Sequence, residues 1–124
     1  MNITAAVAGS GFIGPVHVEA LKRIGVRVKG ILGSTPKKSA EAATSLNLEK
    51  GYTSFDEMLE DPEVQAVHLA VPNVLHYDMT KRALAAGKHV MCEKPLAMTS
   101  SESEELVRLA EESGRSAGVC YNIR

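Results

Sequence analysis

The fold is decided by residues 3–14, which read ITAAVAGSGFIG. The first part of this stretch has the length and β-branched content of a buried strand, and the segment that follows has helical periodicity. Gly9, Gly11 and Gly14 therefore occupy a strand-to-helix turn with the spacing G-x-G-x-x-G. In such a turn the first glycine permits a tight bend, the second lets a pyrophosphate approach the backbone, and the third lets the helix pack against the strand. The stretch predicts a dinucleotide-binding site.

The pyrophosphate is expected at the N-terminus of the helix after the turn, where free N–H groups and the helix dipole favour an anion. Phe12 and Ile13, which lie between the second and third glycines, are expected to contact the cofactor as well. The alternative is a turn with a structural role alone, because glycine-rich turns are common in loops.

Strand-like runs and amphipathic helical segments alternate along the rest of the chain. The expected strands cover residues 2–8, 26–32, a brief run near Tyr52, 64–71, 88–92 and 117–121. This alternation is typical of a parallel sheet covered by helices, so we expect an α/β doubly wound Rossmann fold with six strands in the order 3-2-1-4-5-6. The chain has 124 residues and no linker or repeat, which predicts one domain over residues 1–124.

Four positions carry helix-start signals. Thr35 comes just before a proline, and Ser54 and Thr99 each come three residues before a glutamate, so all three are expected to cap helices. Asn73 is expected to cap a helix that runs to Ala86.

Composition excludes several classes of partner. The formal net charge is −1, from 14 basic and 15 acidic side chains, and no basic stripe is interleaved with aromatic residues, so no nucleic acid is expected. No apolar stretch approaches the ~20 residues that span a bilayer, and no positively charged leader precedes the first apolar run, so we expect no membrane contact and a cytoplasmic location. Cys92 and Cys120 match no metal-binding spacing and are expected to be free, buried thiols without a metal.

The end of the second expected strand bears on the choice between NAD and NADP. An acidic residue there accepts hydrogen bonds from the ribose hydroxyls, whereas small polar and basic residues accommodate a 2′-phosphate. The segment over residues 33–38 contains Ser34, Thr35 and two lysines, of which Lys38 is the expected phosphate contact, and it contains no acid. These residues favour NADP weakly over NAD. An ordinary helix cap with two solvated lysines explains them equally well.

Glu93 and Lys94 follow the fifth expected strand, at the edge of the sheet where the glycine turn also lies. A lysine there can exchange a proton with a substrate hydroxyl, which hydride transfer between an alcohol and a ketone requires. The alternative is a surface ion pair in a loop.

Three motifs together resemble the N-terminal domain of the glucose-fructose oxidoreductase/inositol dehydrogenase/rhizopine catabolism family. They are the glycine turn, Val71-Pro72-Asn73 followed by His76, and the run GKHVMCEKPLA over residues 87–97. The resemblance covers essentially the whole chain, and its Glu-Lys-Pro segment is far more specific than the glycine turn.

The resemblance implies roles for individual residues. Lys94 would be the catalytic lysine, which lies beside the nicotinamide and takes part in proton transfer, and its bond to Pro95 is expected to be cis. The further cofactor contacts that it implies are Val71, Pro72, Asn73, His76, Glu93, Asn122 and Arg124. For His76 a histidine satisfied inside a helix is the alternative, and His17 on the first helix is expected to be structural.

The family resemblance also implies an NAD(P)-dependent oxidoreductase that moves a hydride to or from a sugar, polyol or related small molecule. Family members continue into a C-terminal α+β domain, absent here, which supplies most substrate contacts and the usual homo-oligomer interface. We therefore expect a fragment that is inactive on its own. A non-catalytic dinucleotide-binding redox sensor or regulatory module is the main alternative. A methyltransferase with a similar turn is weaker, because it leaves the Glu-Lys-Pro segment unexplained.

Overall fold

The computed structural model describes residues 3–95 and 97–120, and within them six parallel strands form one sheet in the order β3-β2-β1-β4-β5-β6. The strands are β1 (Thr4–Ala8), β2 (Arg27–Leu32), β3 (Lys50–Tyr52), β4 (Ala66–Leu69), β5 (His89–Glu93) and β6 (Ala117–Cys120). The helices are α1 (Ile13–Arg23), α2 (Pro36–Ser45), α3 (Phe55–Glu60), α4 (His76–Ala85) and α5 (Ser100–Ser113), with a short 3-10 helix at Asn73–Leu75. The predicted fold class and strand order are confirmed.

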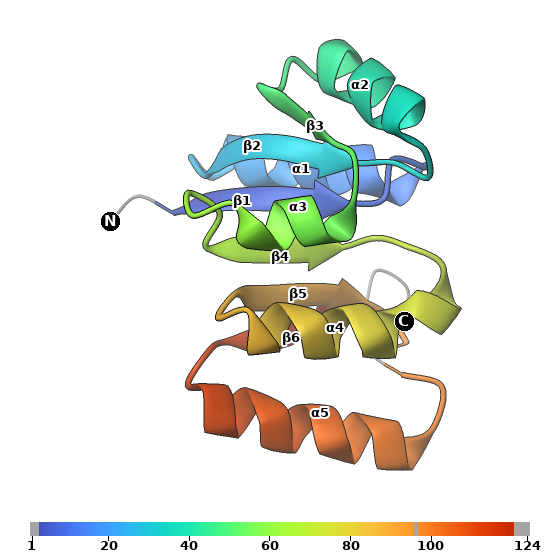
Figure 1. The fold of residues 1–124 in the computed structure, drawn as a ribbon, viewed down its shortest axis with the longest axis vertical. Coiled ribbons are helices and arrows are strands. Elements are labelled where there is room, and N and C mark those ends of the chain that lie inside the picture. Colours follow the sequence, from blue (N-terminus) through green and yellow to red (C-terminus); the bar gives the residue numbers. More distant parts are fainter. Residues whose placement is uncertain (1–2, 96, 121–124) are drawn as a thin grey trace.

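Helices cover the sheet on both faces, and Figure 1 shows α3 and α4 in front of the strands and α1 behind them. Each face has its own apolar cluster. Val18 and Leu21 of α1 pack with Ala43 of α2 on one face, whereas Phe55 of α3 and Met79 of α4 belong to the cluster on the other. Because central strands of such a sheet are buried on both sides, β1 is apolar at consecutive positions rather than at alternate ones.

The hydroxyl caps form as predicted. The side chains of Thr35, Ser54 and Thr99 each accept a hydrogen bond from the backbone N–H three residues on. The prediction that Asn73 caps α4 is wrong, because the chain first makes a 3-10 turn in which the Leu75 N–H bonds to the Pro72 carbonyl. The α-helix then begins at His76 without a side-chain cap.

Parallel pairing brings the carboxyl ends of neighbouring strands to one edge of the sheet. The turns that follow β1, β2, β4 and β5 therefore share this edge. Backbone bonds tie two of these connections to neighbouring strands. Gly9 of the turn after β1 donates to the carbonyl of Leu32 in β2 at 2.7 Å, and Ala70 after β4 donates to the carbonyl of Ala8 in β1 at 2.7 Å. In the described part of the chain, every helix is too short or too polar to cross a membrane.

Candidate functional site

A cleft of about 1060 Å³ lies along the carboxyl edge of the sheet. Its walls come from the glycine turn, from the end of β2 with α2, and from the end of β4 with the connection to α4. Of the predicted cofactor contacts, the cleft is lined by Gly9, Gly11, Phe12, Ile13, Ser34, Lys38, Val71 and Pro72. The structure thus brings together in one hollow three segments that are far apart in the sequence.

The three glycines of the turn meet different surroundings. Gly9 has a φ of +115°, and a Cβ there would lie 2.1 Å from the carbonyl oxygen of Ala70. A Cβ on Gly14 would lie 1.8 Å from the carbonyl oxygen of Gly9, so the third glycine is needed for the packing of α1 against the turn. By contrast, a Cβ on Gly11 would meet nothing within 4 Å. Gly11 therefore presents bare backbone to an open cleft, as a pyrophosphate site requires.

The first turn of α1 carries no acidic side chain that would compete with a bound anion. Phe12 precedes the helix without a side-chain cap. The first N–H groups of a helix lack intrahelical partners and carry the positive end of its dipole. This end of α1 is therefore suited to a phosphate group.

The α2 end of the cleft carries charges of both signs. Ser34 and Lys38 line it as predicted, whereas Thr35 does not and instead caps α2 by accepting a hydrogen bond from the Lys38 N–H at 3.1 Å. Glu41 also lines the cleft, and sequence reasoning missed it because only residues directly after β2 were considered. Its spacing of three from Lys38, which puts the two on one helical face, was the available signal.

His76 does not line the cleft, although it was predicted as a cofactor contact. Its side chain is fully buried, with Nδ1 2.5 Å from the Pro95 carbonyl oxygen and Nε2 2.9 Å from that of Val71. A neutral ring satisfies one of these carbonyls and an imidazolium satisfies both. His76 thus ties the connection after β4 to the connection after β5. Asn73 lies in the 3-10 helix outside the cleft lining.

Glu93 is the last residue of β5, and Lys94 follows it. The Glu93 carboxylate is nearly buried and accepts a hydrogen bond from His17 Nε2 at 2.7 Å. Lys94 is exposed, and within the described residues its ammonium forms no ion pair or hydrogen bond, so the alternative of a surface ion pair is not seen there. The Lys94–Pro95 bond is cis, as predicted. Asn122 and Arg124 lie outside the described residues.

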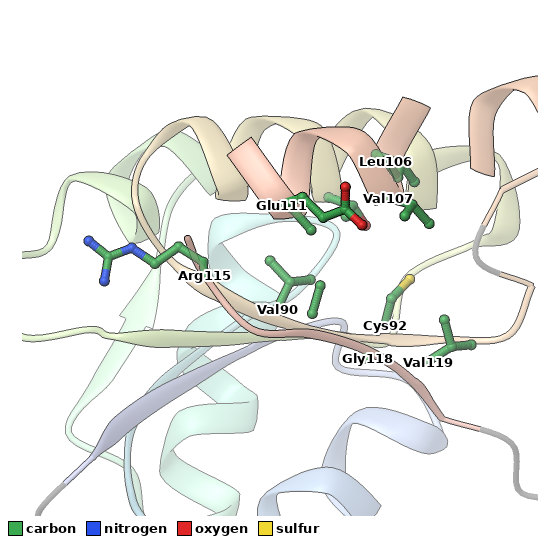
Figure 2. Close-up of a pocket in the computed structure, with 11 residues that line it drawn as sticks. Val90, Cys92, Leu106, Val107, Glu111, Arg115, Gly118 and Val119 are labelled. Carbon is green, nitrogen blue, oxygen red and sulfur yellow. The ribbon is translucent and has the colours of Figure 1, made fainter. Parts of the chain in front are cut away.

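A second cavity, of about 370 Å³, lies between α5 and the strands β5 and β6 and shares no lining residue with the cleft. Figure 2 shows Leu106 and Val107 of α5 above Val90 and Cys92 of β5. Cys92 is free, and burial raises the pKa of its thiol to about 11. At neutral pH this thiol is protonated, and a protonated thiol is a poor nucleophile.

Fold and cleft together define a Rossmann-type dinucleotide-binding domain. The model of a family described as an oxidoreductase family with an NAD-binding Rossmann fold matches residues 3–121. The chain belongs to this family, that of glucose-fructose oxidoreductase, inositol dehydrogenase and the rhizopine catabolism proteins.

Three known proteins illustrate the relationship. The 1,5-anhydro-D-fructose reductase of Ensifer adhaerens is 37% identical over 124 residues, which are 100% of this chain and 37% of the relative. A biliverdin reductase from Synechocystis, solved with biliverdin and NADP+, is 28% identical with a TM-score of 0.87 over 94% of this chain and 37% of that one. A levoglucosan dehydrogenase solved with NADH and levoglucosan is 30% identical with a TM-score of 0.86, over 96% of this chain and 34% of that one. The chain therefore spans little more than a third of each.

Proposed function

We propose that this chain is the nicotinamide-dinucleotide-binding domain of a two-domain oxidoreductase acting on a hydroxyl or carbonyl carbon of a sugar, polyol or related compound. One observation carries the proposal: Lys94, which is exposed and forms no ion pair with the described residues, follows β5 at the same sheet edge as the open cleft. A cofactor site and a proton-transfer group at one edge are what a hydride-transfer enzyme needs.

The residues of the cleft fit a dinucleotide. Gly11 and the uncapped start of α1 would hold the pyrophosphate, and Val71 and Pro72 would line the cofactor. Ser34 and Lys38 support the prediction of NADP, while the carboxylate of Glu41 repels a 2′-phosphate. When bound, the nicotinamide supplies or accepts the hydride.

Lys94 would carry the proton of the reaction. In the oxidation direction its amine Nζ takes the proton of the substrate hydroxyl as the carbon loses a hydride, and in reduction its ammonium returns a proton to the oxygen.

The substrate class rests on relatives whose names specify anhydrosugars. Because those proteins are nearly three times as long as the matched segment, we propose that a second domain completes the substrate site and forms the homo-oligomer contact.

Replacing Lys94 with alanine in the two-domain protein tests this role. We expect kcat to fall by at least about 100-fold, the usual contribution of a positioned acid or base, while the Kd for NADH or NADPH changes less than about twofold. Lys37→Ala, which removes an exposed lysine outside the cleft lining, is the matched control and should leave both quantities unchanged. Unchanged turnover in Lys94→Ala would remove Lys94 from the mechanism. A wild-type protein that binds the cofactor but transfers no hydride would favour the regulatory module instead.

A further inference from the structure

Three side chains from three separate elements form one hydrogen-bonded chain beneath the end of β5. His68 on β4 and His17 on α1 face each other through their Nδ1 atoms at 2.9 Å, with the rings edge to face at 77°. The other nitrogen of His17 lies 2.7 Å from Glu93 Oε1. His17 is 8% exposed and Glu93 is 12% exposed, so water competes little for these bonds.

The protons of this series of three hydrogen-bonded side chains can be assigned by counting donors. Burial, and secondarily the charge of His17, lowers the pKa of His68 to about 4, so near neutral pH His68 carries a single N–H. If that proton is on Nδ1 of His68, a neutral His17 accepts a hydrogen bond from it through its own Nδ1 and donates its Nε2–H to Glu93. If it is on Nε2 of His68, a protonated His17 donates to both neighbours. In either arrangement His17 donates to the Glu93 carboxylate.

Helix α1 links this contact to the glycine turn. The helix begins at Ile13, directly beside the proposed pyrophosphate site, and His17 lies one turn further along it. One short helix therefore carries both the N-terminus beside the proposed pyrophosphate site and the His17 ring that bonds Glu93.

We propose that His17 and His68 are positioning residues, which fix Oε1 of Glu93 so that Oε2 faces an amide donor of the nicotinamide. This inference rests on the proposed function, since it takes Glu93 as a contact of the nicotinamide end. It replaces the expectation that His17 is only structural. The pair sets affinity for the nicotinamide half of a cofactor and leaves affinity for the adenosine and pyrophosphate half unchanged.

Two ligands distinguish binding of the nicotinamide half of the cofactor from binding of the other half: NADH, and ADP-ribose, which lacks the nicotinamide. With this chain, His17→Leu is expected to weaken NADH binding by about tenfold, as the loss of one charge-assisted hydrogen bond predicts, and to change ADP-ribose binding by less than about twofold. His17→Gln keeps an N–H donor at this position and should restore most of the NADH affinity. A structural role alone would weaken both ligands together.

His89→Leu is the matched control. His89 lines the same small cavity beside β4–β6 as His68 does, but it bonds to the Ser116 N–H and not to Glu93. Its NADH to ADP-ribose affinity ratio should equal that of the wild type. If His17→Leu does not fold, His68→Leu provides the test, with a smaller loss for NADH alone.

Equal losses for the two ligands, or no loss for NADH, would overturn the inference. Failure of the wild-type chain to bind either ligand would instead overturn the proposed function, so the two failures are distinguishable.

Discussion

Replacing His76 with alanine is expected to lower the free energy of unfolding by about 3–5 kcal/mol. The ring is completely buried, and its two nitrogens contact the carbonyl oxygens of Val71 and Pro95. Its removal leaves a cavity and takes the hydrogen-bond donor from at least one of these carbonyls, and buried groups without partners are costly. Urea unfolding followed by circular dichroism measures the loss.

His89→Ala serves as the control for this substitution. His89 is half-buried and accepts one hydrogen bond, from the Ser116 N–H at 3.0 Å, so its loss should be about 1 kcal/mol. A loss for His76→Ala no larger than that of the control would contradict the view that His76 ties the two connections together. Because these connections lead to the cleft and to Lys94, we also expect weaker dinucleotide binding in any His76→Ala protein that folds.

The second large effect is expected at Gly14. Its substitution by alanine places a Cβ 1.8 Å from the Gly9 carbonyl oxygen, so α1 must move away from the turn. We expect a loss of roughly 3 kcal/mol, which corresponds to a fall in Tm of about 10 °C, together with at least tenfold weaker NADH binding. Thermal unfolding and a binding titration report the two quantities.

Gly11→Ala separates stability from binding. Apart from its chain neighbours, a methyl group there meets no atom of the described residues within 4 Å, so the Tm should stay within about 2 °C of the wild type. The same methyl group would occupy the surface that the pyrophosphate approaches, so NADH binding should weaken about tenfold or more. Normal binding by Gly11→Ala would show that the open side of the turn is not where the cofactor lies, and an unchanged Tm for Gly14→Ala would contradict the packing of α1.

The fold was predictable because its signals are local and repeated. Alternating strand and helix segments, hydroxyl caps such as Thr35 and the glycine turn each depend on residues close in sequence, and they agree with one another. The error at Asn73 arose at a boundary, where a 3-10 turn and a helix cap have similar sequence patterns.

The site was predictable where it lies directly after a strand and not where it depends on tertiary contacts. Val71 and Ser34 line the cleft because they follow β4 and β2. The contact of His17 with Glu93 spans 76 residues, and no local pattern indicates such a pair. For His76 the alternative of a histidine satisfied inside the protein was open, but its partners could not be named, because they are backbone carbonyls that every sequence has.

The central claim is that the cleft beside Gly11 binds a nicotinamide dinucleotide. Titration of this chain with NADH and with NADPH, followed by nicotinamide fluorescence, tests it most directly. We predict saturable binding, tighter for NADPH if Ser34 and Lys38 outweigh Glu41, and its loss in Gly11→Ala. A marked preference for NADH would overturn the prediction of NADP alone, whereas no binding of either cofactor by the folded chain would contradict the account itself.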